Sequence, residues 1–332
     1  MTVRSHRSAG VLCLLMSALL MAGPSAHAQR MPPVRIGILD YGKGDATRLA
    51  WWNAFRERLA QLGYVENRNV LFEPRFAEAD PDRLHAYAAE LVKAKVHLIA
   101  TGGTPAAIAA KQATSKIPIV TATGSDFDGV GLVRNLARPG GNLTGVTSLT
   151  NELSAKRVQL LRTFVPAATR VAALYDESNS ASRLALKDTL DAATSLRITV
   201  IAINVRNAAD LGRADNKLQE ESVHALIILA SPAMLALRRP LAELAFKRRL
   251  PAITGSREYA EAGGLISYGT DYPQLFRRAA EYADQILKGA KPGDMPIEQP
   301  NKFSLVVNTR TATALGMEVP QAALALADEV IR

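Results

Sequence analysis

The sequence predicts an α/β protein built from two doubly wound parallel sheets. Short apolar runs typical of buried strands alternate with amphipathic stretches typical of helices, and this alternation starts at Val34. Roughly halfway along the chain the pattern begins again, so that each half supplies about five strands. The chain has 332 residues, of which 48% are hydrophobic and 21% charged, a composition that suits two domains with a core each.

Local signals predict the elements of the first half. Residues 34–40 (VRIGILD) form an apolar strand, and residues 48–62 carry apolar side chains at helical spacing until Gly63 ends that helix. Asp80 is placed to cap a helix that has Pro81 in its first turn. Further apolar runs predict strands over 69–76, 96–100, 117–123 and 143–147, and a helix is expected over 104–114.

The second half repeats this alternation. An amphipathic helix is expected over 273–287, because Leu275, Ala279, Tyr282 and Ile286 recur on one face. The other predicted elements are a helix over 153–164, a strand over 170–175 with a helix that continues to about residue 196, strands over 198–205, 225–230, 251–254, 265–268 and 303–307, and helix after Thr311.

The first 28 residues have the three parts of a secretory signal peptide. A basic head with Arg4 and Arg7 precedes an apolar run over 11–21, and Ala26-His27-Ala28 is a small-x-small cleavage site. The apolar run is shorter than the roughly 20 residues that a membrane-spanning helix needs. We therefore expect cleavage near Ala28 and a periplasmic mature protein.

Composition also limits the possible partners. The single cysteine, Cys13, lies in the predicted signal peptide, and the five histidines are scattered, so neither a disulfide nor a metal site nor a cofactor is expected. The net charge is +9, but most basic residues are mixed with acids. We interpret the one dense basic group, Arg238-Arg239 with Lys247-Arg248-Arg249, as a solvated helix face and expect no nucleic acid partner.

Polar residues follow the predicted strands at the edge where a ligand is expected. In open parallel sheets, ligands bind beyond the carboxyl ends of the strands. Gly102 and Gly103 allow a ligand to approach the backbone, and the helix that starts at Thr104 directs free N–H groups towards an anion. The candidate site residues at these ends are Asp40, Tyr41, Gly102, Gly103, Thr104, Thr123, Ser125, Asp126, Phe127, Asp176, Ser178, Asn179, Ser231, Ser256 and Tyr268.

The sequence gives no positive sign of catalysis. It contains no Gly-x-Ser-x-Gly elbow, no Walker A loop and no dinucleotide-binding glycine fingerprint. Asp126, Asp128 and Asp176 form no recognisable acid–base pair in the sequence. We therefore predict a binding protein and not an enzyme.

Several motifs resemble the substrate-binding proteins of ABC transporters, in the branch that includes tryptophan binders. The motifs are TGGTPAA (101–107), KIPIV (116–120), GLV (131–133), ARPGGNLTG (137–145), EAGGLISYG (261–269), RRAA (277–280), ILKGA (286–290), EQP (298–300) and ALG (314–316). They occur in the family's order over nearly the whole chain after the signal peptide.

The resemblance implies a type I periplasmic binding fold, in which two lobes joined by a three-crossing hinge hold a ligand between them. We assign residues 31–147 and 265–300 to the first lobe, and residues 148–264 and 301–332 to the second. Candidate hinges lie near Thr147, Gly264 and Pro300. The implied partners are a small-molecule ligand, a permease in the inner membrane and its ATPase, and the expected state is a monomer.

The resemblance also implies an amino-acid-like or aromatic carboxylate ligand. Thr104, Thr123 and Ser125 would then bind the carboxylate. Asp126 or Asp176 would bind an ammonium group. Tyr41, Phe127 and Tyr268 would wall the side chain. The family commonly has Asn-Pro where this chain has Asp176-Glu177, and its loop 121–128 also differs, so the ligand can differ from that of any relative.

Two alternatives share the predicted architecture. A sensory binding protein would hand its closed form to a membrane receptor instead of a permease, and pull-down of the membrane partner separates these functions. A two-lobed transferase would need a nucleotide-sugar donor, which the predicted export disfavours.

Overall fold

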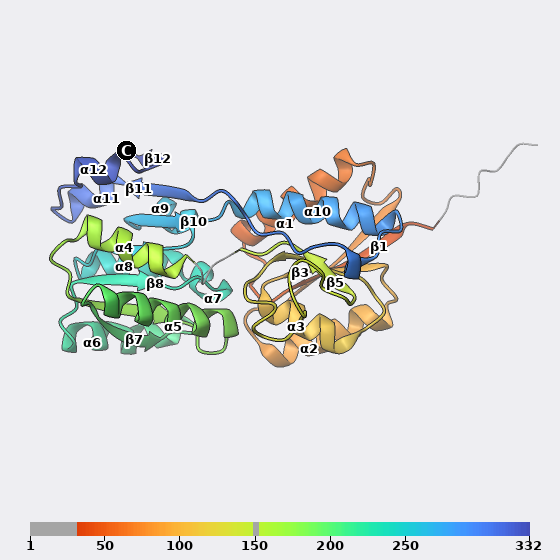
Figure 1. The fold of residues 1–332 in the computed structure, drawn as a ribbon, viewed down its shortest axis with the longest axis horizontal. Coiled ribbons are helices and arrows are strands. Elements are labelled where there is room, and N and C mark those ends of the chain that lie inside the picture. Colours follow the sequence, from red (N-terminus) through yellow and green to blue (C-terminus); the bar gives the residue numbers. More distant parts are fainter. Residues whose placement is uncertain (1–31, 149–152) are drawn as a thin grey trace, which may run out of the picture. The chain divides into compact units, whose positions relative to one another are not determined.

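The computed structural model describes residues 32–148 and 153–332, which form two lobes with one β-sheet each (Figure 1). The predicted signal peptide over 1–28 lies outside the described residues. No helix within the described ranges is long and apolar enough to span a membrane.

The first lobe contains a five-stranded parallel sheet in the order β2-β1-β3-β4-β5. Its strands are β1 (Val34–Asp40), β2 (Val70–Phe76), β3 (Leu98–Gly102), β4 (Ile119–Thr123) and β5 (Leu143–Gly145). The helices around it are α1 (Ala46–Gln61), α2 (Pro81–Lys93), α3 (Thr104–Ala113) and α10 (Tyr272–Leu287). The strand β1 has the predicted bounds, and Asp80 caps α2 as predicted.

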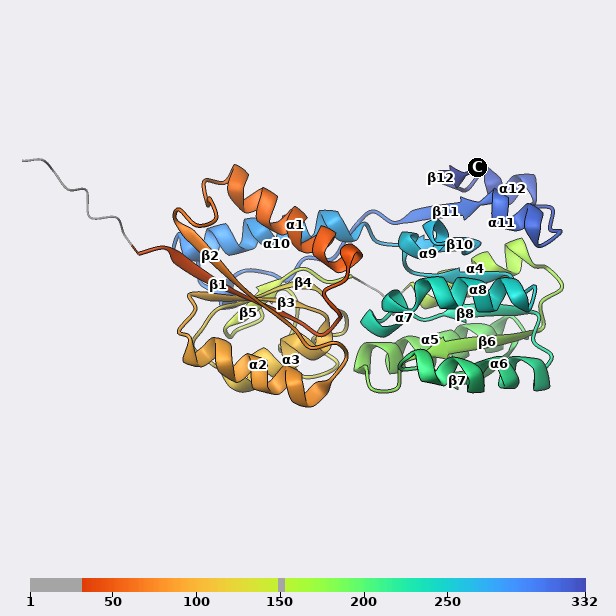
Figure 2. The ribbon, with the colours of Figure 1, turned by 180° about the vertical axis from the view of Figure 1, so that it is seen from behind.

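Both faces of this sheet are covered, as the continuous apolar strands predict. The helices α1 and α10 pack on one face and α2 and α3 on the other (Figures 1 and 2). Ile36 and Ile38 point into the α1–α10 core, whereas Leu39 points into the α2–α3 core. This two-sided burial leaves only the ends of the strands available for a site.

Aromatic packing fixes α10 against α1, although more than 200 residues separate them in sequence. The ring of Phe276 meets that of Trp52 edge-on, with centroids 4.8 Å apart at 88°. The four apolar residues predicted to form one face of α10 are all buried. A chain segment that follows most of the second lobe therefore completes the core of the first.

The second lobe contains a seven-stranded sheet in the order β12-β11-β10-β9-β8-β6-β7. Its strands are β6 (Arg170–Tyr175), β7 (Thr199–Asn204), β8 (Ala225–Ile228), β9 (Ala252–Thr254), β10 (Ile266–Gly269), β11 (Ser304–Asn308) and β12 (Glu329–Ile331). Its helices are α4 (Ser154–Phe164), α5 (Ser180–Ser195), α6 (Leu211–Glu220), α7 (Pro232–Ala236), α8 (Arg238–Lys247), α9 (Arg257–Glu261), α11 (Thr309–Ala314) and α12 (Gln321–Leu324). The 3₁₀ turn Ala208–Asp210 belongs to this lobe, whereas a second 3₁₀ turn, Pro292–Asp294, accepts from the N–H of Gly140 in the first lobe.

Three details differ from the sequence predictions. The strand β10 pairs with β9 and β11, so residues 266–269 belong to the second lobe and not, as expected, to the first. Gly264 therefore precedes a strand within the second lobe and is not a crossing point. The strand β11 runs antiparallel to β10, and a short strand, β12, replaces the helix expected at the end of the chain.

Segments that cross between the lobes are hydrogen-bonded to one another. The N–H of Glu298 donates to the carbonyl of Gly145 at 2.9 Å, and the N–H of Thr147 donates to the carbonyl of Glu298 at 2.9 Å. Thr270 Oγ1 donates to the carbonyl of Ser148 at 2.9 Å. These bonds tie the segments after β5, β10 and α10 together; part of the first crossing, 149–152, lies outside the described residues.

Candidate functional site

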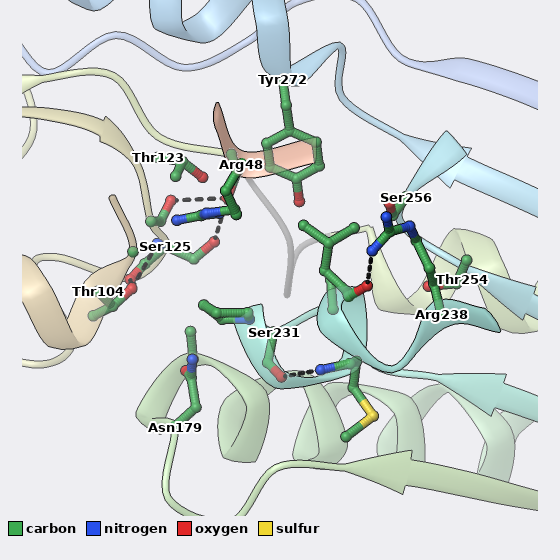
Figure 3. Close-up of a pocket in the computed structure, with 18 of the residues that line it drawn as sticks. Arg48, Thr104, Thr123, Ser125, Asn179, Ser231, Arg238, Thr254, Ser256 and Tyr272 are labelled. Carbon is green, nitrogen blue, oxygen red and sulfur yellow. Dashed lines mark hydrogen bonds between the residues drawn. The ribbon is translucent and has the colours of Figure 1, made fainter. Parts of the chain in front are cut away.

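A pocket forms where the carboxyl ends of β3 and β4 in the first lobe face the ends of β8 and β9 in the second. Figure 3 shows Arg48, Thr104 and Ser125 on one side of it. Its lining residues are Arg48, Trp51, Gly103, Thr104, Thr123, Gly124, Ser125, Ser148, Asn179, Ala181, Ile228, Ala230, Ser231, Pro232, Met234, Leu235, Arg238, Thr254, Ser256, Tyr259 and Tyr272.

The N-terminus of α3 lies on the first-lobe side of the pocket. The N–H of Gly103 donates to the carbonyl of Thr123 at 3.0 Å, those of Ala106 and Ala107 donate to the carbonyl of Gly103, and Pro105 has no N–H, so fewer free N–H groups remain here than the sequence predicts. Gly103 adopts a left-handed backbone (φ +100°), which favours glycine, and it leaves α3 without a side-chain cap. Thr104 Oγ1 accepts from the N–H of Ser125 at 3.0 Å and donates to the carbonyl of Ser125 at 3.2 Å. These bonds fix the loop after β4 beside the positive end of the helix, an arrangement that suits a carboxylate.

A buried ion pair lies directly behind this surface. Arg48 Nη2 lies 2.6 Å from both carboxylate oxygens of Asp40. Trp52 Nε1 donates to Asp40 Oδ2 at 2.7 Å, and the N–H of Gly42 donates to Asp40 Oδ1 at 2.7 Å. Asp40 is fully buried and Arg48 is 5% exposed. The pair therefore holds a guanidinium rigidly at the pocket wall, and Nε of that guanidinium is buried without a hydrogen-bond partner.

Gly102 is required by this ion pair. A Cβ at that position would lie 2.8 Å from Arg48 Nη2 and closer still to the carboxylate of Asp40. Any side chain at residue 102 would displace the pair. Gly102 thus shapes the pocket from behind and does not line it.

Aromatic rings form a second wall. Trp51 stacks on Tyr272, with ring centroids 4.4 Å apart at 14°, and the Arg48 guanidinium lies 5.0 Å from the centroid of Trp51. The indole Nε1 of Trp51 donates to Glu258 Oε1 at 2.9 Å. The other oxygen of Glu258 accepts from Ser256 Oγ at 2.5 Å. One carboxylate therefore orients both an aromatic ring and a hydroxyl of the lining.

The second lobe contributes residues from helix starts. Asn179 caps α5 by accepting from the N–H of Ser182, and Ser231 caps α7 by accepting from the N–H of Met234. Arg238, at the start of α8, lies 3.2 Å from Asp45 Oδ2 of the first lobe. The hydroxyl of Tyr259 is buried and has no hydrogen-bond partner.

The structure brings part of the predicted site together. Gly103, Thr104, Thr123, Ser125, Asn179, Ser231 and Ser256 all line the pocket. They come from strand ends that sequence reasoning assigned to one edge of each sheet.

Besides Gly102, three further predicted residues of the first lobe support the pocket without lining it. Asp40 binds Arg48, as described above. Tyr41 is 1% exposed; its hydroxyl donates to the carbonyl of Ala79 at 2.9 Å, and burial raises the pKa of this phenol. Phe127 is fully buried in the α2–α3 core.

Asp126 lies in the loop after β4 but outside the lining. It adopts a left-handed backbone (φ 56°). Burial and the neighbouring Asp128 raise the pKa of its carboxyl. Its surroundings therefore disfavour the charged form instead of offering it a cation.

The predicted second-lobe residues outside the lining are Asp176, Ser178 and Tyr268. Asp176 is fully buried, and its Oδ1 accepts from the N–H of Ser178 at 3.0 Å and from the hydroxyl at 2.5 Å. Ser178 Oγ also lies 3.3 Å from the hydroxyl of Tyr41. Burial raises the pKa of Asp176, whose Oδ2 has no hydrogen-bond partner. The ring of Tyr268 is tilted towards that of Phe303, 6.2 Å away.

Sequence reasoning missed Arg48, Arg238, Tyr259 and Tyr272 as lining residues. The interpretation of Arg238 as part of a solvated helix face is wrong, because this residue is 18% exposed by its side chain and pairs with Asp45. Lys247 and Arg248 do pair at the surface, with Asp215. Asp40 ends β1 and Arg48 lies in the first turn of α1, and this placement could have predicted an ion pair between them beside the site.

Within ranges 32–148 and 153–332, no group of three or more His, Cys, Asp or Glu is arranged to hold a metal ion. The arrangement consists of hydrogen-bond donors, two guanidiniums and an aromatic wall. It can bind and orient a small anion with a ring.

The chain is similar in sequence to known proteins. The ABC transporter substrate binding protein family matches residues 35–331. A tyrosine-binding protein of Clostridioides difficile is 26% identical over 264 residues, which cover 80% of this chain and 76% of that protein.

Solved structures show the same fold. A conserved domain protein of Vibrio cholerae has a TM-score of 0.84 at 24% identity and covers 90% of this chain and 99% of its own. An ABC domain of Streptococcus pneumoniae in complex with L-Trp has a TM-score of 0.83 at 24% identity, with 90% and 100% covered. The predicted fold class and family resemblance are confirmed.

Proposed function

The chain belongs to the family of ABC transporter substrate-binding proteins, and from this premise we propose that it captures a small carboxylate ligand of the amino-acid or aromatic-acid class. The ligand lies in the pocket between the two sheets and is then delivered to the transporter's permease. The observation that carries this proposal is the pairing of a carboxylate site with an aromatic wall in one pocket: Thr104, Ser125 and Arg48 beside the stacked rings of Trp51 and Tyr272.

The division of roles follows from the lining. Thr123, Ser125 and the backbone N–H of Thr104 at the uncapped start of α3 bind the carboxylate, with Arg48 next to them, while the Thr104 hydroxyl holds the loop of Ser125 in place. Trp51 and Tyr272 contact the ring of the ligand. Ser231, Ser256 and Asn179 contact it from the second lobe, so that the ligand bridges the two sheets and stabilises the closed arrangement.

The names of two relatives support this class. The C. difficile relative is a tyrosine-binding protein, and the S. pneumoniae structure contains L-Trp. Both ligands combine a carboxylate with an aromatic ring, which supports the class proposed for this chain.

The setting of the protein is part of the proposal. Residues 1–28 act as a cleaved signal peptide, and the mature monomer works in the periplasm with an inner-membrane permease and its ATPase. Sequencing the N-terminus of the exported protein tests cleavage after Ala28. Size-exclusion chromatography with light scattering tests the monomer, and cross-linking in cells tests contact with a permease.

Native mass spectrometry tests ligand capture directly. The mature protein, purified from cells without unfolding, is expected to carry an extra small mass that disappears after unfolding and refolding. The recovered compound should raise the melting temperature of the refolded protein with increasing concentration. A compound that is instead converted to a product by the purified protein would show an enzyme.

A further inference from the structure

We propose that the pocket selects an aromatic carboxylate that carries no ammonium group. This inference rests on the function proposed above and narrows its ligand class. An aromatic amino acid and its deaminated counterpart share a ring and a carboxylate and differ in one positive charge. The charges that surround the pocket distinguish between the two.

The lining is positive on both sides. Arg48 comes from α1 in the first lobe, and Arg238 comes from α8 in the second. Among the lining residues in the described part of the chain there is no Asp or Glu. Glu258, outside the lining, already accepts from the lining residues Trp51 and Ser256, one through each of its oxygens. An ammonium group would therefore meet two guanidiniums and no lining carboxylate, whereas a carboxylate meets two attractive partners.

Arg48 has donor capacity left for a ligand. Asp40 occupies Nη2 only, and Nε is buried without a partner. An unpaired buried donor is costly in a native protein, and a bound acceptor removes that cost. Because Asp40 lies behind the guanidinium and is fully buried, it orients the cation without presenting a negative surface to the pocket.

Arg238 supplies the second positive charge of the lining. Its Nη1 lies between Asp45 Oδ2, at 3.2 Å, and the carbonyl of Leu235, at 2.9 Å. Asp45 is outside the lining, as Asp40 is. In both ion pairs the cation faces the pocket and the anion is set back from it.

The acids expected to bind an ammonium group are unsuited to that role. Asp126 is outside the lining, next to Asp128. Asp176 is outside it too, fully buried, and bonded to Ser178. Burial raises the pKa of Asp176, and although its Oδ2 has no hydrogen-bond partner, the residue is not part of the lining.

Three polar side chains of the lining already make hydrogen bonds within the protein. Thr104 is bonded in both directions to Ser125, and Ser231 accepts from Met234 as a helix cap. The oxygen of Asn179 accepts from Ser182. Each of these oxygens keeps one lone pair, so an ammonium group would find neutral acceptors among them but no charged partner.

The ring of the ligand is set by the apolar part of the lining. Trp51 and Tyr272 form a stacked aromatic pair in the lining. Pro232, Met234 and Leu235 of α7 add apolar side chains to it. A flat ring of the ligand can contact both the aromatic pair and the apolar residues of α7. The expected ligands are arylalkanoic acids of the size of the aromatic amino acids.

Matched ligand pairs test the inference on the wild-type protein. The refolded, ligand-free mature protein is titrated calorimetrically with indole-3-propionate and L-tryptophan, and with 3-(4-hydroxyphenyl)propionate and L-tyrosine. In at least one pair the deaminated acid is expected to bind about tenfold tighter or more than the amino acid.

A variant pair checks that charge causes the preference. Arg238→Gln is expected to weaken binding of the preferred acid by about tenfold. Lys247→Gln is the control, because Lys247 lies on the same helix and also pairs with an aspartate, but it is outside the lining. The control is expected to bind within about twofold of wild type.

The outcomes separate this inference from the proposed function. If in neither pair the deaminated acid binds more tightly than the amino acid, the inference is overturned and the proposed function still stands. Binding of neither member of either pair at millimolar concentration overturns both. Equal weakening in Arg238→Gln and Lys247→Gln would also contradict the role given to Arg238.

Discussion

At the scale of single residues, the close approach of Gly102 to the Asp40–Arg48 pair has a measurable cost. In Gly102→Ala the new Cβ would meet Arg48 Nη2 at 2.8 Å, so the pair must move. We expect the free energy of unfolding to fall by about 1–3 kcal/mol and ligand affinity to fall with it. Urea denaturation of the ligand-free protein measures the first effect.

Gly212 provides the matched control. It lies in the first turn of α6, and an added Cβ there would meet no atom within 4 Å. Gly212→Ala is expected to stabilise the protein by about 0.4–1 kcal/mol, because alanine restricts the unfolded chain. If both variants changed stability equally, the crowding assigned to Gly102 would be wrong.

Removal of the buried hydroxyl of Tyr259 is expected not to destabilise the protein. This hydroxyl has no hydrogen-bond partner, and burial raises the pKa of the phenol. Removing an unsatisfied buried hydroxyl costs nothing and can help, so Tyr259→Phe should unfold at the same or a higher denaturant concentration than wild type. A loss of more than about 1 kcal/mol would show that a partner satisfies this hydroxyl.

At the scale of elements, α3 depends on Thr104. The valine isostere in Thr104→Val keeps the shape but removes the acceptor of the Ser125 N–H and the donor to the Ser125 carbonyl. We expect a loss of about 1–2 kcal/mol in unfolding free energy and weaker ligand binding. Denaturation and calorimetric titration of the same preparation give both values.

Thr163→Val is the companion variant for that measurement. The hydroxyl of Thr163 donates to the carbonyl of Gln159 within α4, at an exposed position outside the pocket lining. Its replacement should leave affinity unchanged and stability within about 0.5 kcal/mol of wild type. Reduced affinity in this variant would mean that the effect at Thr104 is not local.

Elements with a strong local pattern could be predicted from the sequence, and elements that depend on distant partners could not. Apolar periodicity was enough for β1 and α10. The strand β12 has three residues and exists only because it pairs with β11, so no local signal distinguishes it from a frayed helix.

The same distinction separates the predicted from the missed site residues. Thr104 and Ser125 follow strands, where topology alone places a site. Arg238 reaches Asp45 across 193 positions of sequence, and its own neighbours suggested only a basic helix surface. Asp40 has the right position for a ligand contact, but Arg48 eight residues later takes both of its oxygens.

At the scale of the whole molecule, acid is expected to loosen the contact between the crossing segments and the first lobe. Hydrogen bonding from Arg278 lowers the pKa of Glu298, whose backbone bonds both Gly145 and Thr147. Since the pKa is lower in the folded state, the pair stabilises the fold above the unfolded pKa of about 4.3. This stabilisation is lost as the pH falls through the lower, folded-state pKa.

Denaturation of wild type and Glu298→Gln at pH 7 and near pH 3 measures this effect. Wild type should be the more stable at pH 7, by less than about 1 kcal/mol because the side chain of Glu298 is 41% exposed, and the difference should shrink in acid. Glu318→Gln, at an exposed position, should show no such trend. A difference that grows on acidification would have the wrong sign for this pair.

The intrinsic fluorescence of the two adjacent tryptophans of α1 can report ligand binding. The chain has two tryptophans, of which Trp51 lines the pocket and Trp52 does not. Trp52 is buried, and its indole N–H donates to Asp40. A bound ring would alter the emission of Trp51 and leave that of Trp52 as an internal reference. Trp51→Phe should therefore silence the fluorescence response to ligand, and the wild-type signal can rank candidate compounds without a label.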